Sequence, residues 1–378
     1  MSLNERAADA NTQWRALGLE RTPATISQLS GAHATIEGCD FVLFSSSDYL
    51  GLSQHPALCT AAIAAHRRFG AGSTGSRLTT GTTAPHVAAE AAIASFIGSE
   101  DAVFFATGYQ ANVSTIQALA SMVPGLTVFS DQLNHASIID GCRLARVPVR
   151  VYPHLNYVRL DEMLSASTAE AKLIVSDGLF SMDGDTADIA RLQQLCHQHR
   201  AWLYIDDAHA IGTIGPSGRG TAELAGGSLP DILIVTASKA LGAEGGFVCC
   251  PTELATWLRN RARSYVFSTA AAPSVPASIS AALPLIPQHL PTLRSKQAQF
   301  AALTGLSISS PIVPIHVGSE TDAMNASAQL KRQGLWVPAI RYPTVARGQA
   351  ILRVTITAQH EDAHLAQLAS ALAELRLI

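Results

Sequence analysis

Short apolar runs alternate with longer segments whose hydrophobic residues recur every three or four positions through most of residues 53–250. Short runs are typical of buried strands, and the longer spacing is typical of helices that bury one face. The strands predicted in this way are 102–105, 126–129, 148–152, 172–176, 202–206 and 232–236, with 247–250 as a further candidate. The predicted helices are 53–69, 85–97, 109–122, 137–144, 160–168 and 187–199. This alternation predicts an α/β fold whose mostly parallel sheet is covered by helices on both faces.

The pattern changes after about residue 285. Beyond it, the spacing predicts strands at 312–317 and 351–357 and helices at 322–333 and 361–376, which is typical of a smaller α+β domain. We therefore expect an N-terminal segment at 1–40, a large domain at 41–285 and a small C-terminal domain at 286–378.

The charge balance excludes binding modes that need a strong electrostatic field. The chain has 378 residues, of which 15% are charged, and its formal net charge is only −3. Neither nucleic acid nor an anionic membrane is attracted by such a balance. The arginines at 259, 261 and 263 are either a solvated helix face or a contact for an anionic substrate.

The cysteines and the apolar segments indicate a cytoplasmic protein. None of the six cysteines forms a C-x-x-C pair, which is typical of free thiols in a reducing compartment. Residues 1–15 mix both charges and lack the apolar centre of a signal peptide. The apolar stretch near 270–286 is interrupted by three prolines, so we expect no membrane span there.

The strand at 232–236 is followed by Ala237-Ser238-Lys239 and then by a glycine-rich turn. A lysine in this position is unusual, because lysines ordinarily stay in solvent. Burial favours the neutral amine, which attacks carbonyl carbons and forms Schiff bases. Lys239 is either such a nucleophile or a surface lysine with a partly buried stem, and its small neighbours favour the nucleophile.

Three other strand ends carry polar residues, at the sheet edge where open α/β folds bind ligands. Asp206 ends an apolar strand, and its carboxylate has three possible uses: it pairs with a buried partner, caps the N-terminus of the next element or binds a metal ion. The metal site is disfavoured, because the Asp-x-x-His motif has no further ligands nearby. His135 follows the strand at 126–129, where an imidazole can stack on a flat ring or transfer a proton. Gly108 opens a helix, whose first N–H groups can bind phosphate.

Two further motifs look like ligand sites, but their contexts are wrong. Gly70-Ala-Gly72-Ser-Thr-Gly75 matches G-x-G-x-x-G, yet a helix precedes it and a polar loop follows it. The dinucleotide motif requires a strand before it and a helix after it. His197 and His199 are two residues apart on a predicted helix, so their side chains face different directions.

A carboxylate, a lysine, an imidazole and a phosphate-binding turn together match what pyridoxal 5′-phosphate needs. Its pyridine nitrogen needs a carboxylate to stay protonated, and its aldehyde needs a lysine. Thr236, three residues before the lysine, is placed to donate a hydrogen bond to phosphate. The sequence therefore predicts an enzyme that holds this cofactor on Lys239, with no metal ion.

The chain resembles the α-oxoamine synthases, pyridoxal-phosphate enzymes of fold type I, over nearly its whole length. The motifs that carry the resemblance are Ser47-Asp-Tyr-Leu-Gly-Leu, Gly72-Ser-Thr-Gly-Ser-Arg-Leu, Asp131-Gln-Leu-Asn-His-Ala-Ser, Phe180-Ser-Met-Asp-Gly-Asp, Asp206-Asp-Ala-His, Thr236-Ala-Ser-Lys and Arg353-Val-Thr. The resemblance implies a homodimer whose active site lies at the subunit interface. Ser47 departs from the commoner Asn of the family and Asp177 from the commoner Glu.

The resemblance also implies roles for individual residues. Lys239 attaches the cofactor, Asp206 pairs with its ring nitrogen, and His135 stacks on its face. His209 contacts its phenolic oxygen. The other implied cofactor ligands are Gly108, Tyr109, Ser181 and Thr236, with Ser268 and Thr269 reaching the phosphate from the partner subunit. The implied substrate ligands are Arg21, Arg353 and Thr355.

Within the family, the segments at 339–345 and 355–360 look most like the branch that uses a pimeloyl thioester. That branch condenses L-alanine with pimeloyl-coenzyme A or pimeloyl-acyl carrier protein, releases CO₂ and thiol, and forms 8-amino-7-oxononanoate for biotin. The alternatives inside the family are 2-amino-3-oxobutyrate ligase, serine palmitoyltransferase and 5-aminolevulinate synthase. An alternative of another class is a catalytically silent binding subunit, which the presence of Lys239 disfavours.

Overall fold

The computed structural model describes residues 1–378, which divide into two compact units. The larger unit comprises 46–313 and 355–365, and the smaller comprises 1–45, 314–354 and 366–378. The boundary expected at 285 differs from this division, because helix α12 (Ile286–Thr304) packs its apolar side chains into the core of the larger unit. The N-terminal segment belongs to the same compact unit as residues 314–354.

A seven-stranded sheet organises the larger unit, in the order β4-β10-β9-β8-β7-β5-β6. Its strands are β4 (Asp101–Phe105), β5 (Leu126–Asp131), β6 (Val149–Tyr152), β7 (Ala171–Asp177), β8 (Trp202–Asp206), β9 (Ile232–Thr236) and β10 (Gly246–Cys250). β10 runs antiparallel to both of its neighbours, and every other pair is parallel. The predicted α/β fold with a mostly parallel sheet is therefore confirmed.

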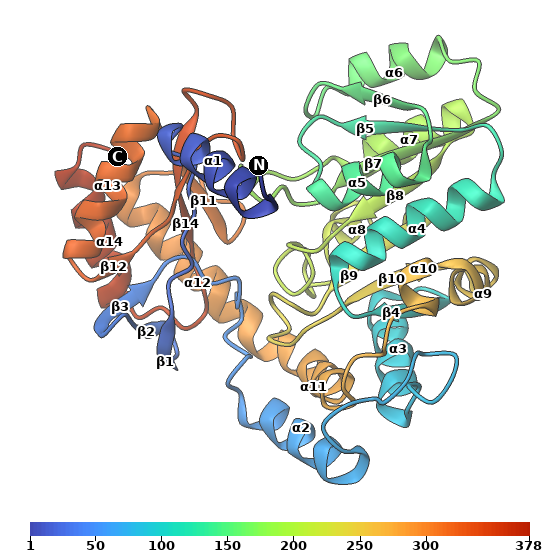
Figure 1. The fold of residues 1–378 in the computed structure, drawn as a ribbon, viewed down its shortest axis with the longest axis horizontal. Coiled ribbons are helices and arrows are strands. Elements are labelled where there is room, and N and C mark those ends of the chain that lie inside the picture. The colour runs from blue at the N-terminus through green and yellow to red at the C-terminus, as the bar shows by residue number, and fades with distance from the viewer. The chain divides into compact units, whose positions relative to one another are not determined.

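Both faces of this sheet are apolar, as helices on both sides require. In β9, Leu233 and Val235 lie in one hydrophobic core, and the alternate residues Ile232 and Ile234 lie in the other. The second core includes residues of α4 and α5, which lie beside the strands in Figure 1. The helices of this unit are α2 (Pro56–Phe69), α3 (Ala84–Ile97), α4 (Gly108–Met122), α5 (Ala136–Ala145), α6 (Tyr157–Ser165), α7 (Ile189–His199), α8 (Thr221–Leu224), α9 (Thr252–Arg261), α10 (Arg263–Val266), α11 (Ser274–Ala282) and α12, with a short 3₁₀ turn at Leu283–Leu285.

Strands β9 and β10 form a hairpin whose connection, residues 237–245, carries Lys239. Thr236 pairs with Gly246 across the hairpin, and the Ala237 N–H donates to the Gly245 carbonyl at 2.9 Å. Gly242 turns the connection with φ +62°, and a Cβ there would lie 2.3 Å from the Ser53 nitrogen. Only glycine satisfies both conditions, so the glycine-rich sequence after Lys239 has a steric cause.

The smaller unit contains two small sheets. The first has the order β1-β2-β3-β12, and β3 pairs in parallel with β12. Most of the second, β11-β14-β13, belongs to this unit. Its elements are β1 (Ile26–Ser30), β2 (His33–Ile36), β3 (Cys39–Leu43), β11 (Ile312–Gly318), α13 (Glu320–Arg332), β12 (Leu335–Trp336), β13 (Ala339–Ile340), β14 (Ala350–Thr355) and α14 (Asp362–Glu374).

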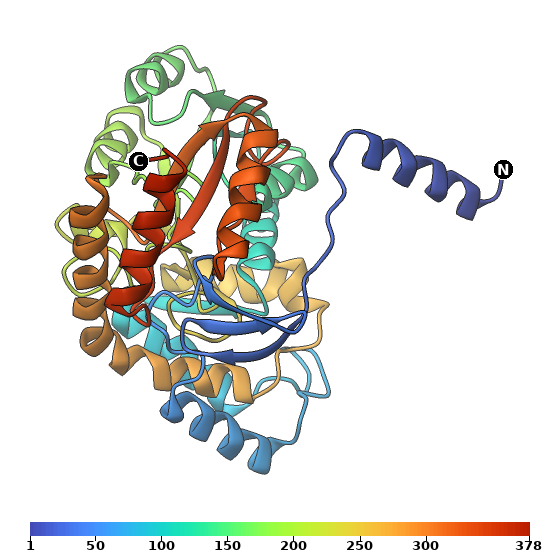
Figure 2. The ribbon, with the colours of Figure 1, turned by 90° about the vertical axis from the view of Figure 1, so that its left-hand side faces the viewer.

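Helix α1 (Leu3–Ala16) buries none of its residues. Figure 2 shows it standing away from the strands β1, β2 and β3 of its own unit. Its stability comes from local contacts, since Ser2 and Glu5 cap its N-terminus reciprocally. No helix of the chain combines the length and the apolar character that are needed to cross a membrane.

Candidate active site

Polar side chains converge on a cavity of about 130 Å³ at the carboxyl ends of the parallel strands. Asp177, Asp206 and Thr236 end β7, β8 and β9, and parallel strands bring such ends to one edge of a sheet. The lining residues are Gly108, Tyr109, Asn112, His135, Ser137, Asp177, Leu179, Asp206, Ala208, His209, Thr236, Ser238 and Lys239. The structure thus brings together the four residues predicted to be catalytic with three of the predicted cofactor ligands.

Asp206 is buried and hydrogen-bonded at both carboxylate oxygens. Oδ1 accepts the Ala208 N–H at 3.0 Å, and Oδ2 accepts an amide N–H of Asn112 at 2.6 Å. Neutral donors stabilise the ionised carboxylate and leave its negative charge uncancelled. The N-cap alternative is wrong, because the next helix along the chain is α8, which begins at Thr221.

Lys239 is half-buried in the hairpin connection, between an exposed Ser238 and a buried Ala240. Its side chain lines the cavity, and its positive charge acts on both His135 and Asp177. The hairpin therefore presents the lysine to the polar groups of the cavity.

His135 forms the N-cap of α5, with its ring at the cavity. Nδ1 lies 2.7 Å from the Ser137 hydroxyl and accepts the Ser137 N–H at 3.3 Å. The Tyr109 ring packs edge-on against it, with 6.4 Å between ring centroids. Burial lowers the pKa of His135 below its ordinary 6.5; Asp206 opposes this shift and Lys239 adds to it. The imidazole is therefore predominantly neutral at pH 7.

His209 is held by the motif that begins at Ser47. Its Nδ1 lies 2.6 Å from the hydroxyl of Tyr49, which is fully buried. Asp48 fixes the turn that carries this tyrosine, because its carboxylate accepts the N–H groups of Leu52 at 2.8 Å and Ser53 at 3.1 Å. The motif thus orients the ring of His209 at the cavity.

Helix α4 begins at the cavity with Gly108 and Tyr109. Thr107 caps this helix, since its hydroxyl accepts the Gln110 N–H at 3.1 Å. The first N–H groups of a helix have no carbonyl partner within it, so they attract anionic oxygens. The start of β10 lies close against the start of α4, and this contact requires glycine at 246, because a Cβ there would lie 2.5 Å from the Gly108 Cα.

Thr236 uses its hydroxyl within the hairpin. Oγ1 donates to the Gly245 carbonyl at 2.8 Å and accepts the Ser238 N–H at 3.2 Å. The hydrogen bond predicted from Thr236 to a phosphate therefore requires the hydroxyl to turn away from Gly245. In the present arrangement the side chain shapes the connection that carries Lys239.

Asp177 places a second carboxyl at the cavity. Oδ1 accepts the backbone N–H of His135 at 3.2 Å, and its own N–H donates to the Asn134 side chain at 2.8 Å. Burial and the adjacent charge of Asp206 raise the pKa of Asp177 well above the ordinary carboxyl range. Asp177 thus favours its neutral acid form, which carries a proton that it can donate.

Three predicted cofactor ligands lie outside the lining of this cavity: Ser181, Ser268 and Thr269. Ser181 lies in the turn after β7. Thr269 forms an antiparallel bridge with Ser76, and the Ala270 N–H donates to the Gly75 carbonyl at 2.9 Å. The segment around Thr269 is therefore held on the Gly70–Thr83 loop of its own chain.

The predicted substrate ligands also lie outside the lining of the cavity. Arg21 is exposed in the smaller unit, where its Nη2 lies 3.4 Å from the Thr344 hydroxyl. Arg353 and Thr355 are both buried in β14.

The sequence interpretation assigned no role to Asn112, Ser137 or Ser238, although all three line the cavity. A signal for Asn112 was present, because it lies four residues after Gly108 on a predicted helix. Residues four apart share one face of a helix. Ser238 was visible only as the neighbour of the lysine.

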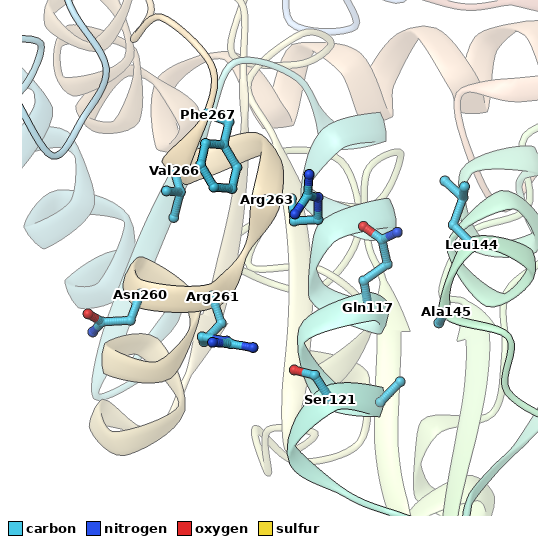
Figure 3. Close-up of a pocket in the computed structure, with 10 residues that line it drawn as sticks. Gln117, Ser121, Leu144, Ala145, Asn260, Arg261, Arg263, Val266 and Phe267 are labelled. Atoms are coloured by element: carbon cyan, nitrogen blue, oxygen red, sulfur yellow. The ribbon is translucent and has the colours of Figure 1, made fainter.

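A larger pocket of about 410 Å³ lies elsewhere on the same unit. Figure 3 shows Gln117 and Ser121 of α4 opposite Arg261 and Arg263. Both arginines lie over aromatic rings, at 5.5 Å from the Trp257 centroid and 5.0 Å from the Phe267 centroid respectively. This pocket has no carboxylate, imidazole or lysine in its lining, so it lacks the groups that the predicted chemistry needs.

The cavity at Lys239 fits pyridoxal 5′-phosphate by its donor set. An amine, an anionic carboxylate and an imidazole are the groups that the aldehyde, the ring nitrogen and the ring face of this cofactor require. The start of α4 supplies N–H groups for a phosphate, and the close approach at Gly246 keeps that turn beside the hairpin.

Comparison with protein families and curated proteins gives similarity over nearly the whole of this chain. The family described as aminotransferase class I and II matches residues 39–372. The 8-amino-7-oxononanoate synthase of Burkholderia thailandensis is 43% identical over 98% of this chain and 97% of its own length. The biotin biosynthesis bifunctional protein BioWF of Corynebacterium kroppenstedtii is 44% identical over 98% of this chain. The chain spans only 58% of the length of that bifunctional protein.

Solved structures share the whole fold. A serine palmitoyltransferase from Sphingomonas wittichii has a TM-score of 0.92 and 30% identity over the full length of both chains. A serine palmitoyltransferase with its pyridoxal phosphate internal aldimine has a TM-score of 0.91 and 29% identity over the same extent. The 8-amino-7-oxononanoate synthase of Francisella tularensis has a TM-score of 0.75 and 26% identity over 88% of this chain and 97% of its own. The expected fold type I architecture is thereby confirmed.

Proposed function

Since the chain belongs to the class I and II aminotransferase family and, within it, to the 8-amino-7-oxononanoate synthases, we propose that it condenses L-alanine with a pimeloyl thioester. A bond forms between the alanine Cα and the thioester carbonyl carbon, the thiol leaves, and the alanine carboxylate leaves as CO₂. The product is 8-amino-7-oxononanoate, for biotin biosynthesis. The observation that carries the proposal is that Lys239, Asp206 and His135 line one cavity.

The cofactor that we propose is pyridoxal 5′-phosphate, which, when bound, acts as an electron sink for negative charge at the amino acid Cα. Lys239 supplies the amine for its aldehyde, and Asp206 supplies a negative charge for its ring nitrogen. His135 covers the ring and His209 donates to the phenolic oxygen. The other proposed cofactor ligands are Gly108, Tyr109, Ser181 and Thr236.

Lys239 and His135 have distinct roles in the proposed reaction. Lys239 removes the Cα proton of L-alanine through Nζ and returns a proton after CO₂ has left. His135, neutral at pH 7, donates a hydrogen bond to the substrate carboxylate or to the new keto oxygen. Arg21, Arg353 and Thr355 bind the substrate.

The proposed assembly is a homodimer in the cytosol. The partner subunit's Ser268 and Thr269 reach the cofactor phosphate, and two facts support this arrangement. Neither residue lines the cavity of its own chain, and the adjoining Phe267 is 72% exposed. Phe267 shares the lining of the 410 Å³ pocket with Leu144, which is 60% exposed, and neighbouring exposed apolar side chains are typical of a surface that a second subunit covers. The cytosolic location rests on six cysteines that are all free thiols.

The test is turnover by the purified chain after incubation with pyridoxal phosphate. We expect a visible absorbance band from the lysine-bound cofactor, and 8-amino-7-oxononanoate detected by mass spectrometry from L-alanine and a pimeloyl thioester. Rates with coenzyme A and with acyl carrier protein as donors identify the carrier. Lys239→Ala should lose both the band and the turnover. Full activity of that variant would refute the proposal.

A second candidate is a serine palmitoyltransferase-like condensation of L-serine with a long-chain thioester. The TM-score of 0.92 to the Sphingomonas wittichii enzyme supports it, but the 30% identity is lower than the 43% identity to the synthase of Burkholderia thailandensis. Rates with alanine, glycine and serine against pimeloyl, acetyl and palmitoyl thioesters separate the candidates. Preference for serine and palmitoyl thioester would replace the main proposal with this one.

A further inference from the structure

Asn112 lies behind the cavity with its side-chain amide fully engaged. It is 1% exposed and sits on α4, one turn after Gly108. One N–H donates to Asp206 Oδ2 at 2.6 Å and the other to the Ser137 hydroxyl at 2.9 Å. The carbonyl oxygen accepts the Tyr204 hydroxyl proton at 2.6 Å. One buried amide thus contacts both Asp206, the predicted partner of the ring nitrogen, and Ser137, which is hydrogen-bonded to His135.

Tyr204 fixes which way this amide points. Its side chain is fully buried in β8, and burial raises the pKa of its hydroxyl well above the ordinary 10. The hydroxyl therefore keeps its single proton at neutral pH and donates it to the Asn112 oxygen. A rotated amide would place its oxygen against the Asp206 carboxylate, which is repulsive, and would deprive the Tyr204 hydroxyl proton of its acceptor. The two N–H donors therefore stay directed at Asp206 and Ser137.

The same amide determines the direction of the hydrogen bond between Ser137 and His135. The Ser137 oxygen accepts from Asn112, so its own proton is available for His135 Nδ1 at 2.7 Å. The Ser137 backbone N–H also donates to Nδ1. An Nδ1 that accepts from two donors carries no proton, so the proton of the neutral ring is on Nε2. His135 is then prepared as a hydrogen-bond donor through Nε2.

We propose that Asn112 is a positioning residue that acts on two partners of the cofactor ring: it holds the Asp206 carboxylate in place for the ring nitrogen and, through Ser137, fixes His135 as the Nε2–H tautomer. The inference rests on the proposed function, because it assumes that the cavity holds pyridoxal phosphate. Asn112 need not touch the substrate, since it acts through Asp206 and His135.

The test compares two variants with a matched control, all in the full chain. Asn112→Leu keeps the volume and removes all three hydrogen bonds, and Ser137→Ala removes only the branch to His135. We expect Asn112→Leu to weaken pyridoxal phosphate binding about ten- to a hundredfold, since it removes a hydrogen bond to a charged group. We expect Ser137→Ala to bind the cofactor normally but to alter the pH profile of kcat/KM. Asn112→Leu should show both effects.

Ser114→Ala is the matched control, because Ser114 is equally buried on α4 and bonds Ser264 outside this network. It should lower the melting temperature without changing cofactor affinity or the pH profile. If Asn112→Leu fails to fold, Tyr204→Phe removes only the bond that orients the amide and should show both effects more weakly. Wild-type affinity and pH profile in Asn112→Leu, with only a lower melting temperature, would overturn the inference. A wild-type chain that binds no pyridoxal phosphate would overturn the proposed function instead.

Discussion

At the scale of single residues, the two carboxyls of the cavity differ in the hydrogen bonds that they receive. Asp206 accepts N–H groups at both oxygens, whereas Asp177 is in contact with one backbone N–H of His135 and lies beside the charge of Asp206. Two carboxyls in one cavity take different roles when their surroundings favour different protonation states. We therefore assign the anionic function to Asp206 and a neutral, donating function to Asp177.

Asp206→Asn tests this assignment, because it removes the charge and keeps the size. We expect kcat to fall about a hundredfold or more, since losing roughly 3 kcal/mol of electrostatic stabilisation has that effect. Steady-state rates at saturating cofactor measure it. Asp177→Asn is the matched control and should lose less than about tenfold, because a neutral amide replaces a largely neutral acid. Equal losses in the two variants would contradict the division of roles.

His154 gives a second residue-scale prediction, about stability and pH. It joins Asp131 at 2.9 Å to Asp185 at 3.0 Å, and its ring packs edge-on against Phe180 at 4.4 Å. Burial alone lowers the pKa of His154, but the hydrogen bonds that the ring donates to Asp131 and Asp185 outweigh burial and raise it to about 10. The imidazolium thereby joins the end of β5 to the turn that contains Ser181.

Because this pKa is raised on folding, the stabilisation is complete below about pH 6.5 and is lost as the pH rises from there to about 10. His154→Gln should remove that dependence, so urea unfolding of wild type and variant should differ most at pH 6 and least at pH 10. The exposed His66, exchanged for glutamine, serves as control and should follow the wild-type pH profile. A difference that grows with pH would contradict the assignment.

At the scale of elements, the contact between the start of α4 and the start of β10 shapes the expected phosphate site. Gly246→Ala places a Cβ 2.5 Å from the Gly108 Cα, so the helix start must move. Such overpacking costs about 1–3 kcal/mol, and we expect cofactor affinity to fall about tenfold with it. Absorbance titration with pyridoxal phosphate measures the loss. Cys250→Ala, at the far end of the same strand, should reduce stability and leave the affinity unchanged.

Hydrophobic spacing predicted the strands of the large sheet well, and it failed for elements stabilised in other ways. β8 and β9 were predicted with their observed ends, because both are continuous buried runs. β1 was not predicted, since all five of its residues are exposed and no alternation marks it. α12 was not predicted either, because Pro287 and Pro291 interrupt its sequence, although Ile286, Leu290 and Leu293 stand at helical spacing.

The site itself was predictable where a residue ends a strand or follows closely after one. Asp206 ends β8, and Lys239 and His135 follow within four residues of the ends of β9 and β5; all three line the cavity. Asn112 has no such signal, because its place beside Asp206 depends on how α4 crosses the sheet, and 94 residues separate the two along the chain. The direction of the Thr236 hydroxyl could not be predicted from the sequence either, since its acceptor is the carbonyl of Gly245, nine residues later.

At the scale of the whole molecule, the proposed dimer predicts that two inactive chains can restore each other. Lys239→Ala lacks the amine, and the double variant Ser268→Ala/Thr269→Ala lacks the proposed phosphate ligands. A mixed dimer has one complete site if Ser268 and Thr269 act across the interface. Random exchange of subunits at equal amounts should therefore restore about a quarter of the sites.

Turnover after co-refolding of the two chains measures this recovery, and each chain refolded alone is the control. No recovery, with mixed dimers verified by differential tags, would show that Ser268 and Thr269 do not complete a neighbouring site. Sedimentation of the wild-type chain provides the oligomeric state independently.

The hairpin between β9 and β10 has a consequence for how the cofactor can be lost. Both strands are interior to the sheet, and Val235 pairs with Phe247 beside the connection that carries Lys239. Interior strands open only in rare, large unfolding events, whereas loops open locally and often. Deuterium exchange at the amides of Val235 and Phe247 should therefore be among the slowest in the chain. Both ends of the connection that carries Lys239 are then as long-lived as the sheet, and heating should detach the cofactor in the same transition that unfolds the sheet.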